Sequence, residues 1–204
     1  MVHKELILST RNKHKVEEIS KILKGFGIEI TSLDDFKDAP EVEEDGDTLA
    51  ENASKKARTI AMHLGKWALA DDTGLEVKYL NGEPGVYSAR WAGEDCSYSD
   101  NNKKLLRELD GIPKSKRKAC FKCVIALSSP KGKVHCVEGR INGIIAEKEM
   151  GNKGFGYDPL FVVPEYGKSF AQLGSTIKNK ISHRARALKK AKKLINKIVV
   201  RGKL

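Results

Sequence analysis

Two adjacent carboxylates, Asp71 and Asp72, directly follow a short apolar segment, residues 67–70, whose pattern predicts a buried strand that ends at these acids. Two acids in that position repel each other and lose hydration, so a fold tolerates them only where a cation or a proton offsets the cost. A hard divalent cation is the usual partner of such carboxylates. A polar junction between strand and turn is the alternative, because Asp, Thr and Gly all favour turns. We therefore expect the chain to be organised around residues 68–93.

The length and apolar pattern of the chain predict one compact domain. With 204 residues the chain can fill a single hydrophobic core, so we expect one domain over residues 1–204. Its apolar runs are all shorter than the roughly 20 residues that a membrane span needs. The N-terminal residues lack the long apolar segment and the small-residue cleavage site of a signal peptide. We expect a cytoplasmic protein without a membrane partner.

The formal charge of +11 is concentrated at one end of the chain. Residues 178–204 contain eleven Lys or Arg and no acid; removing these from the total of 38 leaves 27 basic residues, which equals the number of acidic residues. Such a basic block attracts polyanions, whether a nucleic acid or a triphosphate. A solvated helix face is the alternative interpretation.

Four cysteines are present, and Cys120 and Cys123 have the spacing of zinc and redox motifs. The sequence has no second CxxC and no paired histidine motif to complete a four-ligand zinc site. His135 and Cys136 are adjacent on a predicted strand and should point to opposite faces. We expect the cysteines to be ordinary small core side chains.

An apolar strand, Glu5–Leu8, runs into a polar segment that precedes a helix, because apolar residues at helical spacing begin at Val16. A helix N-terminus offers free N–H groups and a positive dipole end, and Asn12, Lys13 and Lys15 add donors, so this turn could bind phosphate. It matches neither GxGxxG nor the Walker sequence. A helix-capping turn with solvated lysines is the alternative.

An acidic segment, residues 40–47, precedes a second predicted helix that Gly65 should end. Acids before a helix interact favourably with its dipole, which explains them without a functional role. The alternative is that Glu43 or Glu44 shares a cation with Asp72.

Two later segments contain residue types that suit a nucleotide. Residues 151–159 hold three glycines, two aromatic residues and an acid. Glycine lets a backbone approach a ligand closely, and an aromatic ring can stack on a base. Lys178, His183 and Arg184 lie at or just before the start of the last predicted helix, where an anion would sit. A turn rich in Gly and Asp is the alternative for the first segment.

Strands and helices alternate in the first part of the chain, and a hairpin of two strands, residues 118–128 and 133–146, comes later. This order predicts an α/β fold with a mixed sheet.

Five groups of motifs occur in a fixed order along nearly the whole chain. They are TRNKHK at 10–15, Glu44 with ENASKK at 51–56, ADDTGL at 70–75 with PGVYSAR at 84–90, GFGYDP at 154–159, and ISHR at 181–184. Together they resemble the inosine/xanthosine triphosphate pyrophosphatases, which hydrolyse non-canonical purine nucleoside triphosphates to the monophosphate and pyrophosphate.

The resemblance implies a fold, a reaction and partners. The fold is α/β, an elongated mixed twisted sheet flanked by helices, with two lobes and a central active-site cleft. The reaction is Mg²⁺-dependent hydrolysis of ITP, dITP and XTP, which cleanses the nucleotide pool. The partners are the nucleoside triphosphate and a second copy of the chain in a homodimer. Nucleic acid is not expected, because the basic segment lacks interleaved aromatic residues and would leave the acidic cluster unexplained.

The resemblance also implies roles for individual residues. Glu44, in preference to Glu43, and Asp72 would hold Mg²⁺, and Asp72 with Asp71 beside it would orient or deprotonate the attacking water. Lys56 would reach a phosphate. The residues that would hold the triphosphate are Thr10, Arg11, Asn12, Lys13, His14 and Lys15. The residues that would enclose the base or complete the base and phosphate contacts are Phe155, Gly156, Tyr157, Asp158, Lys178, His183 and Arg184.

Two positions depart from the family pattern. Arg11 replaces the usual glycine of the phosphate turn, so it must adopt a compatible backbone conformation or contact phosphate itself. Thr73 replaces the common serine and keeps its hydroxyl, and we include it among the substrate-binding residues. A pyrophosphatase of the same architecture that acts on pyrimidine or modified nucleotides is the alternative function.

Overall fold

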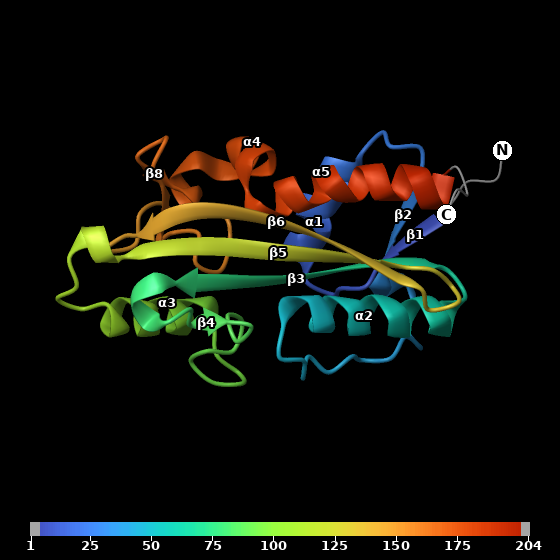
Figure 1. Cartoon of the computed structure of the whole chain (residues 1–204), viewed down its shortest axis with the longest axis horizontal. Helices are drawn as coiled ribbons and strands as arrows, with labels where there is room; N and C mark the ends of the chain where they lie inside the picture. Colours follow the sequence, from blue (N-terminus) through green and yellow to red (C-terminus); the bar gives the residue numbers. More distant parts are fainter. Residues whose placement is uncertain (1–4, 201–204) are drawn as a thin grey trace. The chain divides into compact units, whose positions relative to one another are not determined.

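The computed structural model describes residues 5–200, apart from the side chains of Ile198 and Val200, and this chain divides into two compact units. The first unit contains residues 5–72, 123–139 and 184–200, and the second contains residues 73–122 and 140–183. Three long strands contribute to both units (Figure 1): β3 (Trp67–Val77), β5 (Lys118–Ser128) and β6 (Val134–Ile145).

The first unit is a sheet with helices on both faces. Its other elements are β1 (Glu5–Leu8), α1 (Lys13–Leu23), β2 (Glu29–Ser32), α2 (Leu49–Leu64) and α5 (His183–Ile195). The strand order is β2-β1-β3-β5-β6, and β1 pairs in parallel with both β2 and β3. The carboxyl ends of β1 and β3 therefore point the same way, with Leu8 paired to Leu69, two residues before Asp71.

Along the strands of the first unit, successive side chains point to opposite faces of the sheet, as the pleat of a strand requires, and so pack against different helices. Leu6, Leu8 and Leu69 pack in one cluster with apolar residues of α1 and α5. Ile7 and Ala68 pack in another cluster with residues of α2. The strands are apolar on both faces because both faces are covered.

Helix α2 begins and ends at residues that the sequence predicts. Thr48 and Glu51 form a capping box at its start, and Gly65 ends it with a left-handed φ of 64°. The buried side chain of Asn52 accepts a hydrogen bond of 2.8 Å from the N–H of Gly46. The acidic segment before the helix is thereby fastened to the first turn of α2.

The second unit packs two helices against short antiparallel strands. Its other elements are β4 (Pro84–Gly85), α3 (Tyr98–Glu108), β7 (Phe161–Val163), β8 (Lys168–Ser169) and α4 (Phe170–Ile181). Strand β4 pairs antiparallel with β3, and β7 pairs antiparallel with β6 and β8. The ring centroid of Phe161 lies 4.6 Å from that of Phe121 and 5.3 Å from that of Phe170, at the centre of this unit's core.

The predicted mixed α/β class is confirmed, since parallel and antiparallel pairs occur in the same strand order and helices flank the strands. The prediction that a strand ends at Asp71 is wrong, because β3 continues through Asp71 and Asp72 to Val77. Paired cations, described below, allow both acids to lie inside a buried strand. Helix α4 was not predicted. The single domain over residues 1–204 and the central cleft stay predictions.

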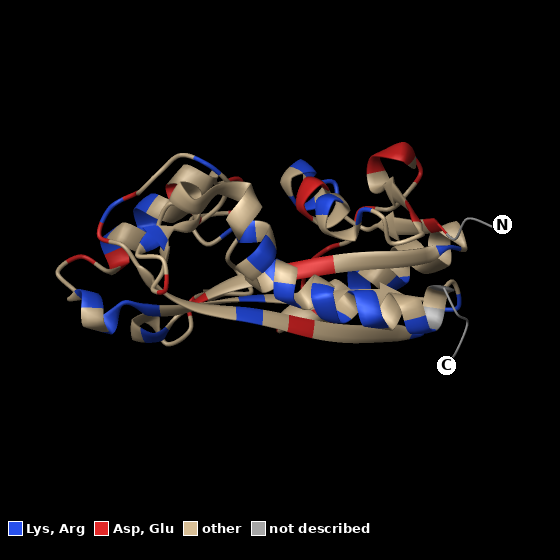
Figure 2. Cartoon of the chain, turned by 90° about the horizontal axis from the view of Figure 1, so that it is seen from above, with Lys and Arg blue, Asp and Glu red and all other residues tan. Residues whose placement is uncertain are grey.

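The basic residues of the C-terminal segment differ in their exposure. Lys178 and Arg184 are buried. Lys192 is half-buried. The exposed basic residues are Lys180, Arg186, Lys189, Lys190, Lys193 and Lys197, of which four lie in α5. Figure 2 shows basic residues along this helix. Arg201 and Lys203 lie outside the described residues. A solvated helix face, which was the alternative interpretation, therefore accounts for most of these basic residues. Lys178 and Arg184 instead belong to the polar clusters described below.

The described cysteines are free thiols. Cys123 is a core residue, as predicted, but Cys136 is exposed, so the expectation of a core position is wrong there. Among residues 5–200, no helix is long and apolar enough to cross a membrane.

Candidate active site

The turn between β1 and α1 is held by its own side chains. The side-chain oxygen of Asn12 caps α1 by accepting from the N–H groups of His14 at 3.1 Å and Lys15 at 3.3 Å. The hydroxyl of Thr10 accepts from the N–H of Asn12 at 3.2 Å. Lys13 and His14 are exposed. The helix-capping part of the alternative is therefore confirmed and Lys13 is solvated, but Lys15 is half-buried and lies 3.3 Å from the carboxylate of Asp71, so the expectation of solvated lysines is wrong there.

Arg11 fits this turn with ordinary backbone geometry. Among the described residues, Asn81 is the only non-glycine with a positive φ, so position 11 does not need a glycine here. The Arg11 guanidinium donates to the carbonyl of Ala39 at 3.3 Å and lies 3.6 Å from the carboxylate of Asp34. Its side chain is thus directed toward the loop that follows β2.

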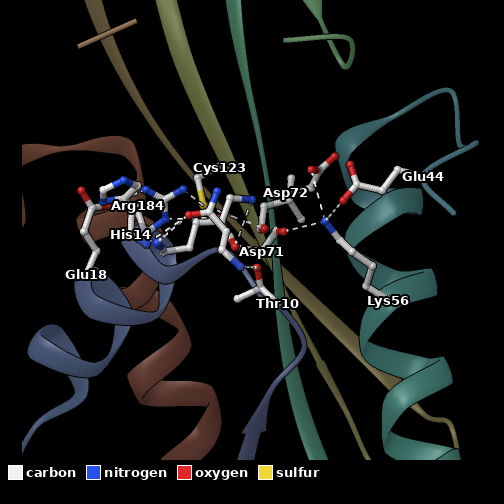
Figure 3. A network of polar contacts seen from close by, with 12 residues as sticks. Thr10, His14, Glu18, Glu44, Lys56, Asp71, Asp72, Cys123 and Arg184 are labelled. Carbon is white, nitrogen blue, oxygen red and sulfur yellow. Dashed lines mark hydrogen bonds and ion pairs between the residues drawn. The ribbon is translucent and has the colours of Figure 1, made fainter. Parts of the chain in front are cut away.

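Asp71 is surrounded by basic side chains (Figure 3). Its carboxylate lies 3.3 Å from the ammonium of Lys15 and accepts from the guanidinium of Arg184 at 2.9 and 3.2 Å. A second acid, Glu18, pairs with the same guanidinium. Burial would raise the pKa of Asp71, but Lys15, Arg184 and Lys56 outweigh it and hold that pKa well below its usual range. Asp71 is therefore an ionised anchor that joins α1, β3 and α5.

Asp72 and Glu44 converge on the ammonium of Lys56, which projects from α2 (Figure 3). The Lys56 Nζ lies 2.5 Å from Glu44 Oε1, 3.4 Å from Asp72 Oδ1 and 2.9 Å from the carbonyl oxygen of Asp71. Glu43 is exposed, whereas Glu44 is half-buried at this contact. The geometry therefore places Glu44, and not Glu43, at the ammonium that Asp72 also contacts, and the choice of Glu44 as a metal ligand stays a prediction.

The three charges of this cluster perturb one another. Burial raises the pKa of Asp72, and the negative charges of Glu44 and Asp71 add to that rise against the opposing effect of Lys56 and Lys15. For Glu44 burial also opposes ionisation, but Lys56 and Lys15 outweigh it and lower the pKa. Burial would lower the pKa of Lys56, yet Asp72, Glu44 and Asp71 raise it. Of the two carboxyl groups at Lys56, that of Asp72 therefore has a raised pKa and that of Glu44 has a lowered one.

The carboxylates at Lys56 suit a hard divalent cation. The Oδ2 atom of Asp72 is buried and has no hydrogen-bond partner among the described residues. Within residues 5–200, no three His, Cys, Asp or Glu side chains are grouped to hold a metal by themselves. Glu44 and Asp72 would therefore supply only part of a coordination shell, which fits a cation that keeps water ligands and binds phosphate oxygens.

The second unit holds a separate polar cluster in the turn that follows Gly154. The ammonium of Lys178, from α4, lies 2.5 Å from the carboxylate of Asp158, and both side chains are buried. The same ammonium is 4.4 Å from the ring centroid of Phe155, whose N–H donates to Asp158 Oδ2 at 3.0 Å. Gly154 has a φ of +82°, and a Cβ there would lie 2.0 Å from Asp158 Oδ2, so the turn requires glycine.

Two further predicted residues of the second unit lie in its core. Tyr157 is buried, and its hydroxyl donates to the carbonyl of Ser88 at 3.0 Å. Burial raises the pKa of that hydroxyl well above its usual range. His183 is buried and stacks on Phe121 with ring centroids 4.6 Å apart. Tyr157 and His183 thus fix their segments through packing.

Thr73 lies half-buried in β3, directly after Asp72.

Sequence reasoning missed two residues of these clusters. Glu18 follows Lys15 by three positions on α1, a spacing that places the two side chains on one helix face and could have been noticed. Asn102 of α3 donates to the carbonyl of Gly156 in the turn of the second unit. The sequence carried no signal for that contact, because 54 positions separate the two residues.

Comparisons with known proteins agree with the motifs. The sequence model of the Ham1 family matches residues 6–194. The dITP/XTP pyrophosphatase of Desulforamulus reducens is 50% identical over 196 residues, which cover 96% of this chain and 98% of that protein. The dITP/XTP pyrophosphatase of Geobacter sulfurreducens is 52% identical over 183 residues, covering 90% of this chain and 92% of that protein.

Solved structures show the same fold. The Ham1 protein of Staphylococcus aureus superposes with a TM-score of 0.84 at 39% identity, covering 94% of this chain and 98% of that chain. A HAM1 protein from Coxiella burnetii superposes with a TM-score of 0.86 at 38% identity and the same coverage of both chains.

Proposed function

We propose, from the premise that this chain belongs to the Ham1 family, that it hydrolyses non-canonical purine nucleoside triphosphates to the nucleoside monophosphate and pyrophosphate. Relatives at 50% and 52% identity are named dITP/XTP pyrophosphatases, which supports ITP, dITP and XTP as the substrates. The single observation that carries the proposal is the convergence of Glu44 and Asp72 on Lys56, since hydrolysis of a phosphoanhydride requires acids and cations at one point.

We propose that Mg²⁺ is the cofactor and that Glu44 and Asp72 hold it. Two carboxylates of which one oxygen is buried and lacks a partner suit an ion that takes its remaining ligands from water and phosphate. When bound, the ion supplies positive charge to the phosphate oxygens of the substrate. Lys56 and Lys15 add the positive charge that this chain itself provides.

Asp72 is the proposed general base. Burial, then Glu44 and Asp71, raise the pKa of Asp72 in the chain without an ion. One carboxylate oxygen of Asp72 would hold the ion and the other would take the proton of the attacking water. The water oxygen would form a bond to the α-phosphorus, and the bond from the α-phosphorus to the bridging oxygen would break, with its electron pair leaving on pyrophosphate. Asp71 keeps its charge throughout and holds Lys15 and Arg184 in place.

We propose that residues 10–15 bind the triphosphate and that the cluster of the second unit binds the base. Phe155 offers a ring face, and Asp158 and Lys178 offer an acceptor and a donor. His183 and Arg184 complete these contacts in the proposal. A donor aimed at the 6-oxo oxygen would be left unpaired by adenine, which costs about 1–3 kcal/mol for each buried group.

The substitution Asp72→Asn tests the proposal. Asparagine fills the same volume but cannot accept the proton, so release of pyrophosphate from ITP at fixed Mg²⁺ should fall by at least about 100-fold. Asp45→Asn is the control, because Asp45 forms the exposed pair with Lys55 next to the buried pair of Glu44 and Lys56. Turnover like that of the wild type in a natively folded Asp72→Asn protein would refute the assignment.

A panel of triphosphates tests the substrate class. We expect ITP and XTP to be turned over much faster than GTP and ATP at equal Mg²⁺. Preference for a pyrimidine triphosphate would instead favour the alternative function.

We also propose a homodimer and a cytoplasmic location, as the resemblance implies. Sedimentation equilibrium tests the first by giving the mass of the particle, and fractionation of cells tests the second.

A further inference from the structure

Two adjacent asparagines of α3, Asn101 and Asn102, are 2% and 3% exposed, so both amides are buried. A buried amide is costly unless it is hydrogen-bonded, and each of these bonds a different loop. Asn101 donates to the carbonyl of Ala89 at 3.0 Å and accepts from the N–H of Ala92 at 2.9 Å. It fastens the segment before α3, whereas the turn that follows Gly154 is bonded by Asn102.

Asn102 bonds that turn instead. Its Nδ2 donates to the carbonyl of Gly156 at 3.3 Å and to the carboxylate of Glu149 at 3.0 Å. Its Oδ1 is buried and has no hydrogen-bond partner among residues 5–200. The two hydrogen bonds donated by Nδ2 therefore compensate for the burial of this amide. Their acceptors, Glu149 and Gly156, both lie in the segment that contains the turn.

Gly156 lies between Phe155 and Asp158, the two residues of the turn to which we assign contacts with the base. Phe155 precedes it, and Asp158 follows two positions later, with the N–H of Phe155 bonded to Asp158 Oδ2. Gly156 itself has a φ of +60°. A bond to its carbonyl fixes the peptide plane between Gly156 and Tyr157, which lies one residue after Phe155 and one residue before Asp158 in the turn. Helix α3 contacts the turn a second time, because the ring of Tyr98 lies 5.9 Å from that of Phe155.

We propose that Asn102 is a positioning residue for base selectivity: its bond to the Gly156 carbonyl holds Phe155 and Asp158 in the arrangement that distinguishes one purine from another. This inference rests on the proposed function. Asn102 acts through the turn and does not touch the reacting phosphate, so its loss should impair recognition of the base more than the chemical step.

Asn102→Asp tests this with Asn101→Asp as the matched control. Both substitutions keep the shape of a buried side chain on the same helix and remove its N–H donors. In Asn102→Asp the KM for ITP should rise by about tenfold while kcat changes little, because a displaced turn weakens binding of the base and leaves the phosphate site intact. The preference for ITP over GTP, as a ratio of kcat/KM values, should fall by about tenfold.

Inhibition by pyrophosphate reports the phosphate site alone, since pyrophosphate has no base. Its Ki should be unchanged in Asn102→Asp. Asn101→Asp should keep the wild-type preference for ITP over GTP even if its melting temperature falls as far. Equal changes of preference in the two variants, or an unchanged preference in Asn102→Asp, would overturn the proposal.

Two further outcomes are decisive. If Asn102→Asp does not fold, Asn102→Ser and Asn101→Ser, which introduce no charge, replace the pair, and the same comparison of preferences decides. If the wild-type protein releases no pyrophosphate from ITP, the proposed function fails and this inference fails with it. If the wild-type protein turns over ITP and the two variants show the same preference for ITP over GTP, this inference fails and the proposed function stands.

Discussion

At the scale of single residues, neighbouring aspartates of one strand differ because they face different charges. Burial favours the protonated form of both, but Lys15 and Arg184 hold Asp71 ionised, whereas the pKa of Asp72 is raised. Asp72 shares Lys56 with Glu44, so one cation offsets two acids there. The same residue type thus provides a charged anchor at one position and, at the next, a carboxyl group with a raised pKa, for which we propose the role of general base.

Lys56→Ala should destabilise the fold and abolish activity. Lys56 is the buried cation between Glu44 and Asp72, and leaving such acids without it lowers the free energy of unfolding by about 3 kcal/mol. Urea unfolding measures this loss. Lys55→Ala removes the exposed neighbour that pairs with Asp45 and should leave the urea midpoint unchanged. Equal midpoints for the two variants would contradict the role given to Lys56.

At the scale of elements, the two turns that carry polar clusters are fixed in different ways, one by its own side chains and the other by side chains that are distant in sequence. The turn before α1 is fixed locally by Asn12, while the turn after Gly154 depends on Lys178 of α4 and Asn102 of α3. Tyr157 adds an anchor on the core side by bonding the carbonyl of Ser88. The second turn is therefore sensitive to changes in the helices around it.

The alkaline pH dependence of stability should report the anchor at Tyr157. Burial raises the pKa of its hydroxyl in the folded state above the unfolded value of about 10. A raised folded pKa gives stability that is fully present below the unfolded pKa and is lost as the pH rises above it. Each pH unit above about 10 should remove about 1.4 kcal/mol through this group.

Tyr157→Phe is the variant that isolates this effect. It loses the bond to Ser88 and is less stable than the wild type at pH 8, but it has no hydroxyl to titrate. The difference in urea midpoint between the two proteins should therefore shrink as the pH rises beyond 10. Tyr79→Phe, at an exposed tyrosine, is the control for removal of a hydroxyl. A constant difference would contradict the burial of Tyr157 as the cause.

At the scale of the whole molecule, each unit has its own hydrophobic core and its own polar cluster. The first unit contains the acids and cations assigned to phosphate and metal, and the second contains the ring and ion pair assigned to the base. In the first unit every acid of the cluster already has a basic partner within the chain. Each acid thus has a basic partner without a metal, although four acids, Glu18, Glu44, Asp71 and Asp72, share three cations, Lys15, Lys56 and Arg184.

Removal of divalent cations should separate activity from stability. We expect a chelator to abolish release of pyrophosphate from ITP and to leave the melting temperature unchanged, because each acid of the cluster already contacts a basic side chain of this chain. Adding Mg²⁺ back should restore the rate. Full activity in the chelator would contradict the proposed cofactor, and a large fall in melting temperature would show that these internal partners do not suffice.

The sequence by itself determined the features that depend on neighbouring residues. The apolar spacing that begins at Val16 indicated α1, Gly65 marked the end of α2, and the order of the motifs indicated the family. These features are local because hydrophobic periodicity and capping act within a few positions.

Only the tertiary structure decided how the charges are shared. It placed Glu44 at Lys56, kept Asp71 and Asp72 inside one continuous strand, and joined Arg184 to Glu18 across 166 positions. The reason is that an ion pair depends on distance in space and on burial, and both are set by the packing of segments that are far apart in the chain.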